Sequence, residues 1–403
     1  MDLSIELPLS KSICNRALIL QYLSRGEIRV DAVSSAEDSV VLTRALDSLD
    51  RATLFDLGPA GTAFRFLTAA ACLRNGRRII TGSERMLQRP IGPLVDALRI
   101  LGAQIEYLGE EGYPPIAVEG TTDLPLQTVD IDPSISSQFV SALLLIAPFT
   151  SQGIQIRFTD LPTSRSYLAM TCSVLKQCGV KIDEDPLSIR VYPGFQATRL
   201  NIEADWSAAS YFYSAVALHP NLQILLRGLT AKSLQGDAET ARIYEILQVN
   251  TTQTEAGVII AKDLSRPMPS KVSFDLNNQP DLAQTLMVTC AGLGIDAEWM
   301  GLETLYIKET DRIAAMTAEL NAFGIELIEM GKGKIRQKGK AVKPPENHLI
   351  KTYHDHRMAM AFAPLTLFFP DLTFENPDVV KKSFPSFWRE WLKITATSIQ
   401  QLP

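Results

Sequence analysis

The sequence predicts an α/β protein built from repeated units, arranged as two lobes of about three units each. Three observations support this prediction. The chain has 403 residues, which is too long for one ordinary core. A pattern of helix, glycine and strand recurs at steps of 77, 70 and 75 residues, so a unit of about 70 residues fits between five and six times. Short β-rich runs bounded by Gly and Pro lie between the helices.

The repeated pattern is an apolar helix that stops at a small residue and leads into a strand. Its copies, each with the residue taken as its stop, are 93–105 (Gly102), 167–182 (Gly179), 241–252 (Val249) and 312–327 (Gly324). Residues 154–158 and 188–192 are typical of the strands between them. Repeat counting places the lobe boundary near 230–240. We predict the lobes as residues 10–234 and residues 1–9 with 235–403.

Composition excludes several classes of protein. The chain is 46% hydrophobic and 21% charged, which is ordinary for a soluble globular protein. A net charge of -6 disfavours a nucleic-acid surface, so any group of cations is expected to be local and to bind a small anion. The longest apolar runs, 139–149 and 359–369, are shorter than the roughly 20 residues that span a membrane.

The cysteines and the start of the chain predict a cytoplasmic protein. The first six residues lack the positive region of a secretory signal. The cysteines are odd in number, form no CxxC pair and lie among apolar residues, so we expect reduced core side chains. They are Cys14, Cys72, Cys172, Cys178 and Cys290.

Cations, hydroxyls or glycine recur where apolar helices are predicted to begin. The segments are 10–16, 57–65, 85–90, 136–138, 164–167, 205–210, 277–281 and 353–357. Each one alone reads as a capped, solvated helix start. If the repeats point these ends toward one cleft, helix dipoles and cations sum into a pocket that binds anions. His354 and His356 are two apart and do not face together on a helix, so no metal site is predicted.

The string Lys308-Glu309-Thr310-Asp311-Arg312 precedes the amphipathic run 313–323. Thr310 or Asp311 is expected to cap that helix. Lys308 and Arg312 flank Glu309, an arrangement that suits holding an anion while a carboxylate moves a proton. In isolation the string is more typical of a solvated helix start.

Seven strings, in order, resemble those of 5-enolpyruvylshikimate-3-phosphate synthases (3-phosphoshikimate 1-carboxyvinyltransferases) along nearly the full chain. They are SKSICNRALIL, LGPAGTAFRFLTAA, RMLQRPIGPLVDAL, SSQFVSALLL, LYIKETDRI, YHDHRMAM and KKSFP. The resemblance implies the two-lobed enolpyruvyl transferase fold, an inside-out α/β barrel of six βαβαββ units, three per lobe, that closes like a clamp. It also implies transfer of the enolpyruvyl group of phosphoenolpyruvate to the 5-hydroxyl of shikimate 3-phosphate, with release of phosphate.

The resemblance assigns a role to each matched residue. Phosphoenolpyruvate is expected at Lys11, Gly61, Arg89, Gln138, Arg312, Arg357 and Lys382. Shikimate 3-phosphate is expected at Lys11, Ser12, Arg16, Ser136, Ser137, Gln138, Ser164, Tyr167, Asp281 and Lys308. Asp281 is implied as the base and Glu309 as the proton donor, with Lys11 also in the catalytic set. The resemblance implies no metal or organic cofactor, and we expect a monomer.

Some residues depart from the family pattern. Pro59 and Thr304 stand where the family has asparagine, and Leu9 stands where it has glycine. Pro59 removes an amide donor near phosphoenolpyruvate, and Thr304 reaches less far than asparagine. The chain also starts with less of the first strand than the family has. These changes bear on affinity and inhibitor response more than on the type of reaction.

Two other functions fit parts of the sequence. A UDP-N-acetylglucosamine enolpyruvyl transferase has the same fold and donor, but that family has a cysteine in the loop before its RP motif, and residues 82–89 contain none. A catalytically idle binding protein could keep the fold. Phosphate release with each acceptor distinguishes the three.

Overall fold

The computed structural model describes residues 3–132, 136–346 and 348–400. The chain forms two compact units: unit 1 contains residues 1–8 and 203–403, and unit 2 contains residues 9–202. The predicted boundary after residue 234 therefore differs from the observed one by 32 residues. Residues 206–227 belong to unit 1 because they form a helix that packs within that unit and a strand that pairs with its other strands. The short strand at residues 3–6 joins the same unit.

In unit 2, two sheets have four strands with one shared pattern: two parallel strands, then an antiparallel hairpin. In sheet order the first contains β3 (Leu54–Asp56), β4 (Gly76–Thr81), β6 (Ile116–Gly120) and β5 (Gln104–Tyr107). The second contains β7 (Thr128–Ile131), β8 (Ile154–Phe158), β10 (Ser188–Val191) and β9 (Ile182–Asp185). A third, of two parallel strands, joins β11 (Thr198–Leu200) to β2 (Ile28–Val30).

Unit 1 repeats this organisation. Its first sheet contains β1 (Leu3–Glu6), β12 (Gln223–Arg227), β14 (Gly257–Lys262) and β13 (Val249–Thr254). Its second contains β15 (Lys271–Asp275), β16 (Asp296–Met300), β18 (Lys334–Lys338) and β17 (Glu326–Gly331). Its third joins β19 (Leu349–Ile350) to β20 (Thr373–Phe374) in parallel. Three sheets per unit confirm the predicted repeat, although in the described residues one copy per unit keeps only two strands.

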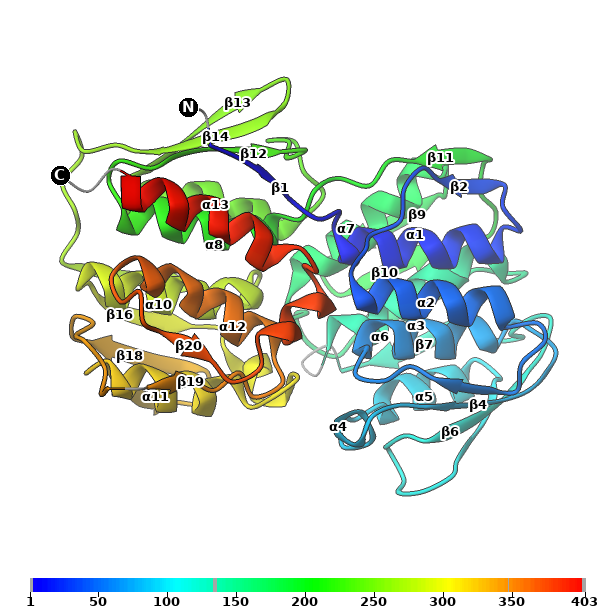
Figure 1. Cartoon of the computed structure of the whole chain (residues 1–403). Helices are drawn as coiled ribbons and strands as arrows, with labels where there is room; N and C mark the ends of the chain where they lie inside the picture. The colour runs from blue at the N-terminus through cyan, green and yellow to red at the C-terminus, as the bar shows by residue number, and fades with distance from the viewer. Residues whose placement is uncertain (1–2, 133–135, 347, 401–403) are drawn as a thin grey trace. The chain divides into compact units, whose positions relative to one another are not determined.

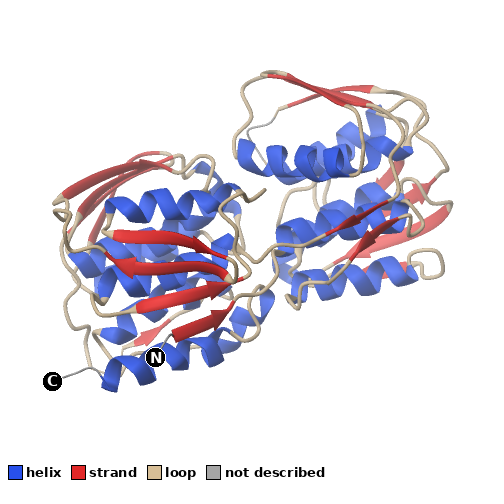
Figure 2. Cartoon of the chain, turned by 90° about the horizontal axis from the view of Figure 1, so that it is seen from above, coloured by secondary structure: helices blue, strands red, loops and turns tan. Residues whose placement is uncertain are grey.

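The helices form the interior of each unit and the sheets lie outside them (Figures 1 and 2). The central helices are α1 (Lys11–Leu23), α3 (Gly61–Ala71) and α6 (Ser137–Ile146) in unit 2, and α8 (Trp206–Leu218), α10 (Ala283–Leu293) and α12 (His356–Phe362) in unit 1. Nearly every residue of α3, α8, α10 and α12 is buried, as expected for helices that are apolar all round. The sheets remain separate, so the described strands close no barrel, and the α/β class is confirmed.

The remaining helices pack around this centre. They are α2 (Glu37–Ser48), α4 (Glu84–Leu87), α5 (Gly92–Ile100) and α7 (Arg165–Gln177) in unit 2, and α9 (Thr240–Ile246), α11 (Arg312–Ala322) and α13 (Phe387–Gln400) in unit 1. The short 3-10 helices are η1 (Ala147–Phe149), η2 (Gly236–Glu239), η3 (Pro280–Leu282), η4 (Glu303–Ile307), η5 (Ala363–Leu367) and η6 (Pro377–Lys382). No helix in the described part of the chain has the length and apolar character needed to cross a bilayer.

The helices that revealed the repeat are α5, α7, α9 and α11, each of which precedes the antiparallel hairpin of a four-stranded sheet. Three end at a glycine with positive φ, as predicted. In the fourth copy Gln248, with φ of 65°, occupies that position, so choosing Val249 was wrong by one residue. The predicted helix at 358–369 ends at Phe362, because Pro364 has no amide to continue it. All five cysteines are free and buried, as expected.

Candidate active site

In unit 2, Arg16 of α1 contacts three other helices, α3, α6 and α7. Its guanidinium donates to the Ser12 carbonyl at 2.7 Å and to Ser141 Oγ of α6 at 3.2 Å. It also donates to Thr171 Oγ1 and to the Tyr167 carbonyl of α7, at 2.7 and 3.2 Å, and it lies over the Phe66 ring of α3. Ser12 and Tyr167 lie in the first turns of α1 and α7, whereas Phe66, Ser141 and Thr171 lie one turn or more into their helices. Arg16 therefore ties α1 to the bodies of α3 and α6 and to the first half of α7.

These contacts limit the hydrogen bonds that Arg16 can donate to a ligand. Burial lowers the pKa of Arg16 to about 10, so the group stays cationic at neutral pH. Four of the five N–H donors of its guanidinium already bond to protein oxygens. Arg16 therefore acts first as a brace between α1, α6 and α7, and little of its donor capacity remains for a ligand.

Lys11, the first residue of α1, pairs with a carboxylate that the sequence analysis did not single out. Its Nζ lies 2.8 Å from Asp38 Oδ2, and Asp38 is buried in the first turn of α2. The two residues are 27 positions apart. An acidic residue in a helix's first turn is common, so no sequence pattern marks Asp38 as the partner of Lys11.

Gly61 begins α3 against two arginines. Arg65 donates to the Gly61 carbonyl at 2.9 Å and to the Pro90 carbonyl at 3.2 Å, which ties the helix start to the segment carrying Arg89. A Cβ on Gly61 would lie 2.7 Å from Nη1 of both Arg65 and Arg89. Glycine at this position therefore leaves room for the two guanidinium groups.

The other predicted residues of unit 2 lie at the starts of α6 and α7. Ser136 caps α6 by accepting from the Gln138 amide at 3.3 Å. Gln138 Oε1 is buried and accepts no hydrogen bond from the described residues. Ser164 precedes α7 in the left-handed region, with φ of 54°, and its side chain makes no cap bond. A left-handed backbone conformation is energetically unfavourable for a residue other than glycine, and such residues are frequent at functional sites.

In unit 1, the buried guanidinium of Arg312 binds three carboxylates. It donates to Asp355 Oδ2 at 2.7 Å, to Asp281 Oδ1 at 3.0 Å and to Glu309 Oε2 at 3.0 Å. Arg312 begins α11 and Glu309 lies just before it, whereas Asp281 lies in η3 before α10 and Asp355 lies just before α12. The cap of α11 is Asp311, which accepts from the Ala314 amide at 3.0 Å, so the choice left open between Thr310 and Asp311 is decided.

Asp281 is surrounded by cations. Arg357 donates to its Oδ2 at 2.7 Å, Arg312 to its Oδ1, and Lys308 Nζ lies 3.7 Å from the same Oδ1. Burial by itself would raise the pKa of Asp281, but Arg357, Lys308 and Arg312 hold that pKa well below its usual range. Asp281 is therefore a carboxylate in this structure, which is the form a base requires.

Glu309 lies between two other cations. Its Oε1 accepts from Lys382 Nζ at 2.9 Å, and its Oε2 accepts from Arg312. Lys382 ends η6 and is buried. The two carboxylates predicted to move protons thus sit on different nitrogens of one guanidinium, each with cations of its own.

The start of α12 supplies the remaining groups. Asp355 is fully buried, caps α12 by accepting from the Arg357 amide at 2.9 Å, and holds Arg312. Arg357 Nη1 also lies 3.4 Å from Tyr211 Oη of α8, and burial raises the pKa of Tyr211 to about 12. The sequence predicts a capped helix start at residues 353–357, but no sequence signal marks the pairing of Asp355 with Arg312, 43 positions away.

The three departures from the family pattern lie in helix starts or in short helices. Pro59 is followed by Ala60, the residue before α3, and the Leu9 carbonyl accepts from Ser34 Oγ at 2.8 Å. Thr304 Oγ1 in η4 is buried and bonds to no atom of the described residues. The threonine at 304 thus places a buried hydroxyl in η4 without a hydrogen bond to any described residue.

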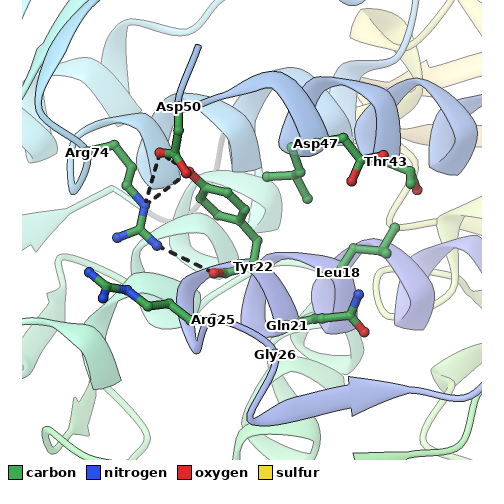
Figure 3. A pocket seen from close by; sticks show the side chains of 10 residues that line it. Leu18, Gln21, Tyr22, Arg25, Gly26, Thr43, Asp47, Asp50 and Arg74 are labelled. Atoms are coloured by element: carbon green, nitrogen blue, oxygen red, sulfur yellow. Dashed lines mark hydrogen bonds and ion pairs between the residues drawn. The ribbon is translucent and has the colours of Figure 1, made fainter.

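A pocket of about 570 Å³ opens between α1 and α2 (Figure 3). Arg74 donates to Tyr22 Oη at 3.0 Å, and Tyr22 donates to Asp50 at 2.7 Å. None of the residues assigned to substrates lines this pocket; the lining is Leu18, Gln21, Tyr22, Arg25, Gly26, Thr43, Leu46, Asp47, Asp50 and Arg74. Most of the predicted site residues lie instead at or just before helix starts, and Lys382 lies at the end of η6.

Comparison with known proteins decides the family. The sequence model of EPSP synthase (3-phosphoshikimate 1-carboxyvinyltransferase) matches residues 50–391. The chain belongs to the EPSP synthase family. It is 41% identical over 392 residues to the 3-phosphoshikimate 1-carboxyvinyltransferase of Bacteroides fragilis strain YCH46, which covers 97% of this chain and 94% of that protein. The corresponding enzyme of Neisseria meningitidis serogroup B is 34% identical, covering 98% and 96%.

Solved structures support the same fold. An EPSP synthase from Acinetobacter baumannii has a TM-score of 0.75 at 21% identity, covering 98% of this chain and 96% of that one. The enolpyruvyl transferase NikO from Streptomyces tendae has a TM-score of 0.70 at 13% identity, covering 97% and 94%. The EPSP synthase fold predicted from the seven strings is therefore confirmed.

Asp237, in η2, makes the stability of this family member depend on pH. Burial raises the pKa of Asp237 to about 7, with Asp281 adding to the effect and the hydrogen bond from Ser207 opposing it. A carboxyl in the unfolded chain titrates near 4, so the folded state binds this proton more tightly. The stabilisation that this proton gives to the folded state is complete below about pH 4 and is lost as the pH rises through about 7.

Asp237→Asn removes this titration. Between pH 5 and 7.5 the variant should gain about 1–3 kcal/mol in free energy of unfolding relative to wild type. Urea unfolding at several pH values measures the difference, with the exposed Asp371→Asn as the matched control. Parallel pH profiles for wild type and Asp237→Asn would contradict the expectation.

Proposed function

We propose that this chain transfers the enolpyruvyl group of phosphoenolpyruvate to the 5-hydroxyl of shikimate 3-phosphate and releases phosphate. The observation that carries the proposal is the cluster around Arg312, where Asp281 and Glu309 are held by four cations. Two anionic substrates and two proton transfers require cations and two separate carboxylates. The chain's membership of the family agrees with this chemistry.

The residues of unit 2 are proposed mainly as ligands. Shikimate 3-phosphate contacts Lys11, Ser12, Arg16, Ser136, Ser137, Gln138, Ser164 and Tyr167, and phosphoenolpyruvate contacts Lys11, Gly61, Arg89 and Gln138. The starts of α1, α3, α6 and α7 support these roles, since first-turn amides and the helix dipole favour anions. The unused acceptor of Gln138 suits a substrate hydroxyl.

The residues of unit 1 are proposed to bind substrate and to move protons. Arg312, Arg357 and Lys382 hold phosphoenolpyruvate, and Lys308 and Asp281 contact shikimate 3-phosphate. These cations pair with carboxylates in the structure. An anionic substrate would share them, which weakens their hold on Asp281 and Glu309 and raises the proton affinity of both groups.

The proposed reaction is an addition followed by an elimination. Asp281 takes the proton of the 5-hydroxyl as that oxygen bonds to C2 of phosphoenolpyruvate, and Glu309 gives a proton to C3. The result is a tetrahedral intermediate that keeps the phosphate. Elimination then returns a proton from the C3 methyl group to Glu309 as the C2–O bond to phosphate breaks, and the proton held by Asp281 passes to the departing phosphate. Lys11 is proposed as a cation of the catalytic set that stabilises developing charge.

The test is phosphate release from phosphoenolpyruvate with two acceptors, shikimate 3-phosphate and UDP-N-acetylglucosamine. We expect release with shikimate 3-phosphate alone. Release only with the sugar nucleotide would assign the chain to the other acceptor. No release with either acceptor would make the chain an idle binding protein and overturn the proposal.

We further propose that the protein is a cytoplasmic monomer that needs no metal or organic cofactor. Light scattering during gel filtration should give a mass near 44.5 kDa. Turnover should survive dialysis against a chelator, and loss of turnover that zinc or magnesium restores would contradict this part.

Gly61→Ala tests the position of Arg89. The added methyl group would press on Nη1 of Arg65 and Arg89, and the flexible ends of both side chains must shift. We expect the KM for phosphoenolpyruvate to rise about tenfold, while the KM for shikimate 3-phosphate and the melting temperature change little. Steady-state kinetics with each substrate varied separately measures this, with Ala60→Gly as a neighbouring control. Equal changes in both KM values would show that the substitution does not act through the position of Arg89.

A further inference from the structure

The turn that leads into α12 has a costly backbone. Tyr353 and His354, which follow β19 and precede Asp355, both lie in the left-handed region, with φ of 51° and 55°. Two consecutive residues with side chains rarely adopt this conformation, because the Cβ crowds the backbone. Such a turn persists only where its surroundings hold it.

Glu319 of α11 provides that hold. Its buried carboxylate accepts from Tyr353 Oη at 2.8 Å and from the Lys351 amide at 3.3 Å, and His348 Nε2 lies 3.6 Å from it. Burial and the Glu319 carboxylate raise the pKa of Tyr353, so the phenol keeps the proton that it donates. The carboxylate therefore binds the chain on the N-terminal side of the two costly residues.

The same helix holds the other side of the turn. Arg312 lies seven residues before Glu319, two turns away on the same face of α11. Its guanidinium donates to Asp355 at 2.7 Å, directly after the costly pair. One helix face thus holds the turn at both ends. Figure 1 shows α11 beside β19, from which the turn begins.

We infer that Glu319 is a positioning residue, which clamps the 351–354 turn to α11 so that Asp355 and Arg357 meet Arg312 and Asp281. The inference rests on the proposed function for its effect on turnover, because Arg357 and Arg312 are the proposed ligands of phosphoenolpyruvate. The polar partners of Glu319 in the described residues are Lys351, Tyr353 and His348, and none of these is proposed to contact substrate.

The test compares Glu319→Gln and Tyr353→Phe with wild type. Both variants should raise the KM for phosphoenolpyruvate about tenfold and leave the KM for shikimate 3-phosphate within about twofold. Hydrogen exchange should become faster in the peptide 348–357 and remain unchanged in β17. A purely structural role would lower the melting temperature without separating the two KM values.

A glycine at one of the two left-handed residues should partly restore the function of Glu319→Gln. Glycine tolerates positive φ, and His354 is exposed, so His354→Gly lowers the cost of the turn and removes little packing. The double variant with Glu319→Gln and His354→Gly should have a KM for phosphoenolpyruvate at least about threefold lower than that of Glu319→Gln alone. The matched controls are Glu326→Gln, an exposed glutamate, and Tyr192→Phe, which breaks a phenol bond to Asp183 in β9.

Two results would overturn the inference. One is a wild-type KM for phosphoenolpyruvate in both clamp variants, and the other is unchanged hydrogen exchange in 348–357. Absence of turnover in the wild-type protein would instead overturn the proposed function. Hydrogen exchange would still decide whether Glu319 clamps the turn.

Discussion

Glu309→Gln is expected to lower kcat by about a thousandfold, because a positioned proton donor contributes roughly 10²–10⁴ to the rate. Glutamine keeps the size of the side chain, and its oxygen can still accept from Arg312 or Lys382, which bond to Glu309 in the structure. Loss of the negative charge leaves those cations freer to hold an anion. The KM for phosphoenolpyruvate should therefore stay the same or fall.

The matched control is Asp311→Asn, two residues away in the same segment. Asp311 caps α11 through the Ala314 amide, and asparagine caps a helix about as well. This variant should keep wild-type turnover. Single-turnover measurements of the two variants separate proton transfer from substrate binding. Turnover of Glu309→Gln near the wild-type rate would remove Glu309 from the proton transfer.

Arg312→Ala is expected to cost about 3–5 kcal/mol in free energy of unfolding, the usual effect of breaking a buried ion pair. Burial alone would lower the pKa of Arg312, but Asp355, Glu309 and Asp281 raise it above its usual range. Without the guanidinium, these three buried carboxylates lose their shared cation. Urea unfolding followed by circular dichroism measures the loss.

The pH dependence of this loss has a definite sign. Because the folded pKa of Asp281 is depressed, its ionisation stabilises the fold above the unfolded pKa near 4, and that stability is lost as the pH falls. The deficit of Arg312→Ala should thus be complete at pH 7 and smaller below about pH 4. Arg312→Lys, which keeps one charge, should lose less. A deficit of under about 1 kcal/mol at pH 7 would contradict a central role for Arg312.

Much of the candidate site could be predicted from the sequence because its signals are local. Ser136, Asp311 and Asp355 lie before apolar helices, and each one caps its helix as that position suggests. The glycine stops at 102, 179 and 324 mark the repeat for the same reason, since only the backbone at that position matters. Assigning substrates to these residues needed the resemblance, because a capped helix start carries no sign of its ligand.

The partners of these residues could not be predicted. Lys11 and Asp38 are 27 residues apart, and Arg312 and Asp355 are 43 apart. Each pair meets only because particular helices became neighbours. The lobe boundary was misplaced for a similar reason, since β1 pairs with β12 across more than two hundred residues and no composition change marks residue 203.

The sequence by itself determined the α/β class, the repeated units, the capped helix starts and the family motifs, all of which depend on residues within a few turns of one another. Tertiary structure alone decided that Arg312 holds three carboxylates, that hydrogen bonds to α1, α6 and α7 occupy Arg16, and that Glu319 holds the left-handed turn before α12. Those contacts depend on which elements pack together, and packing is set by the whole core of a unit.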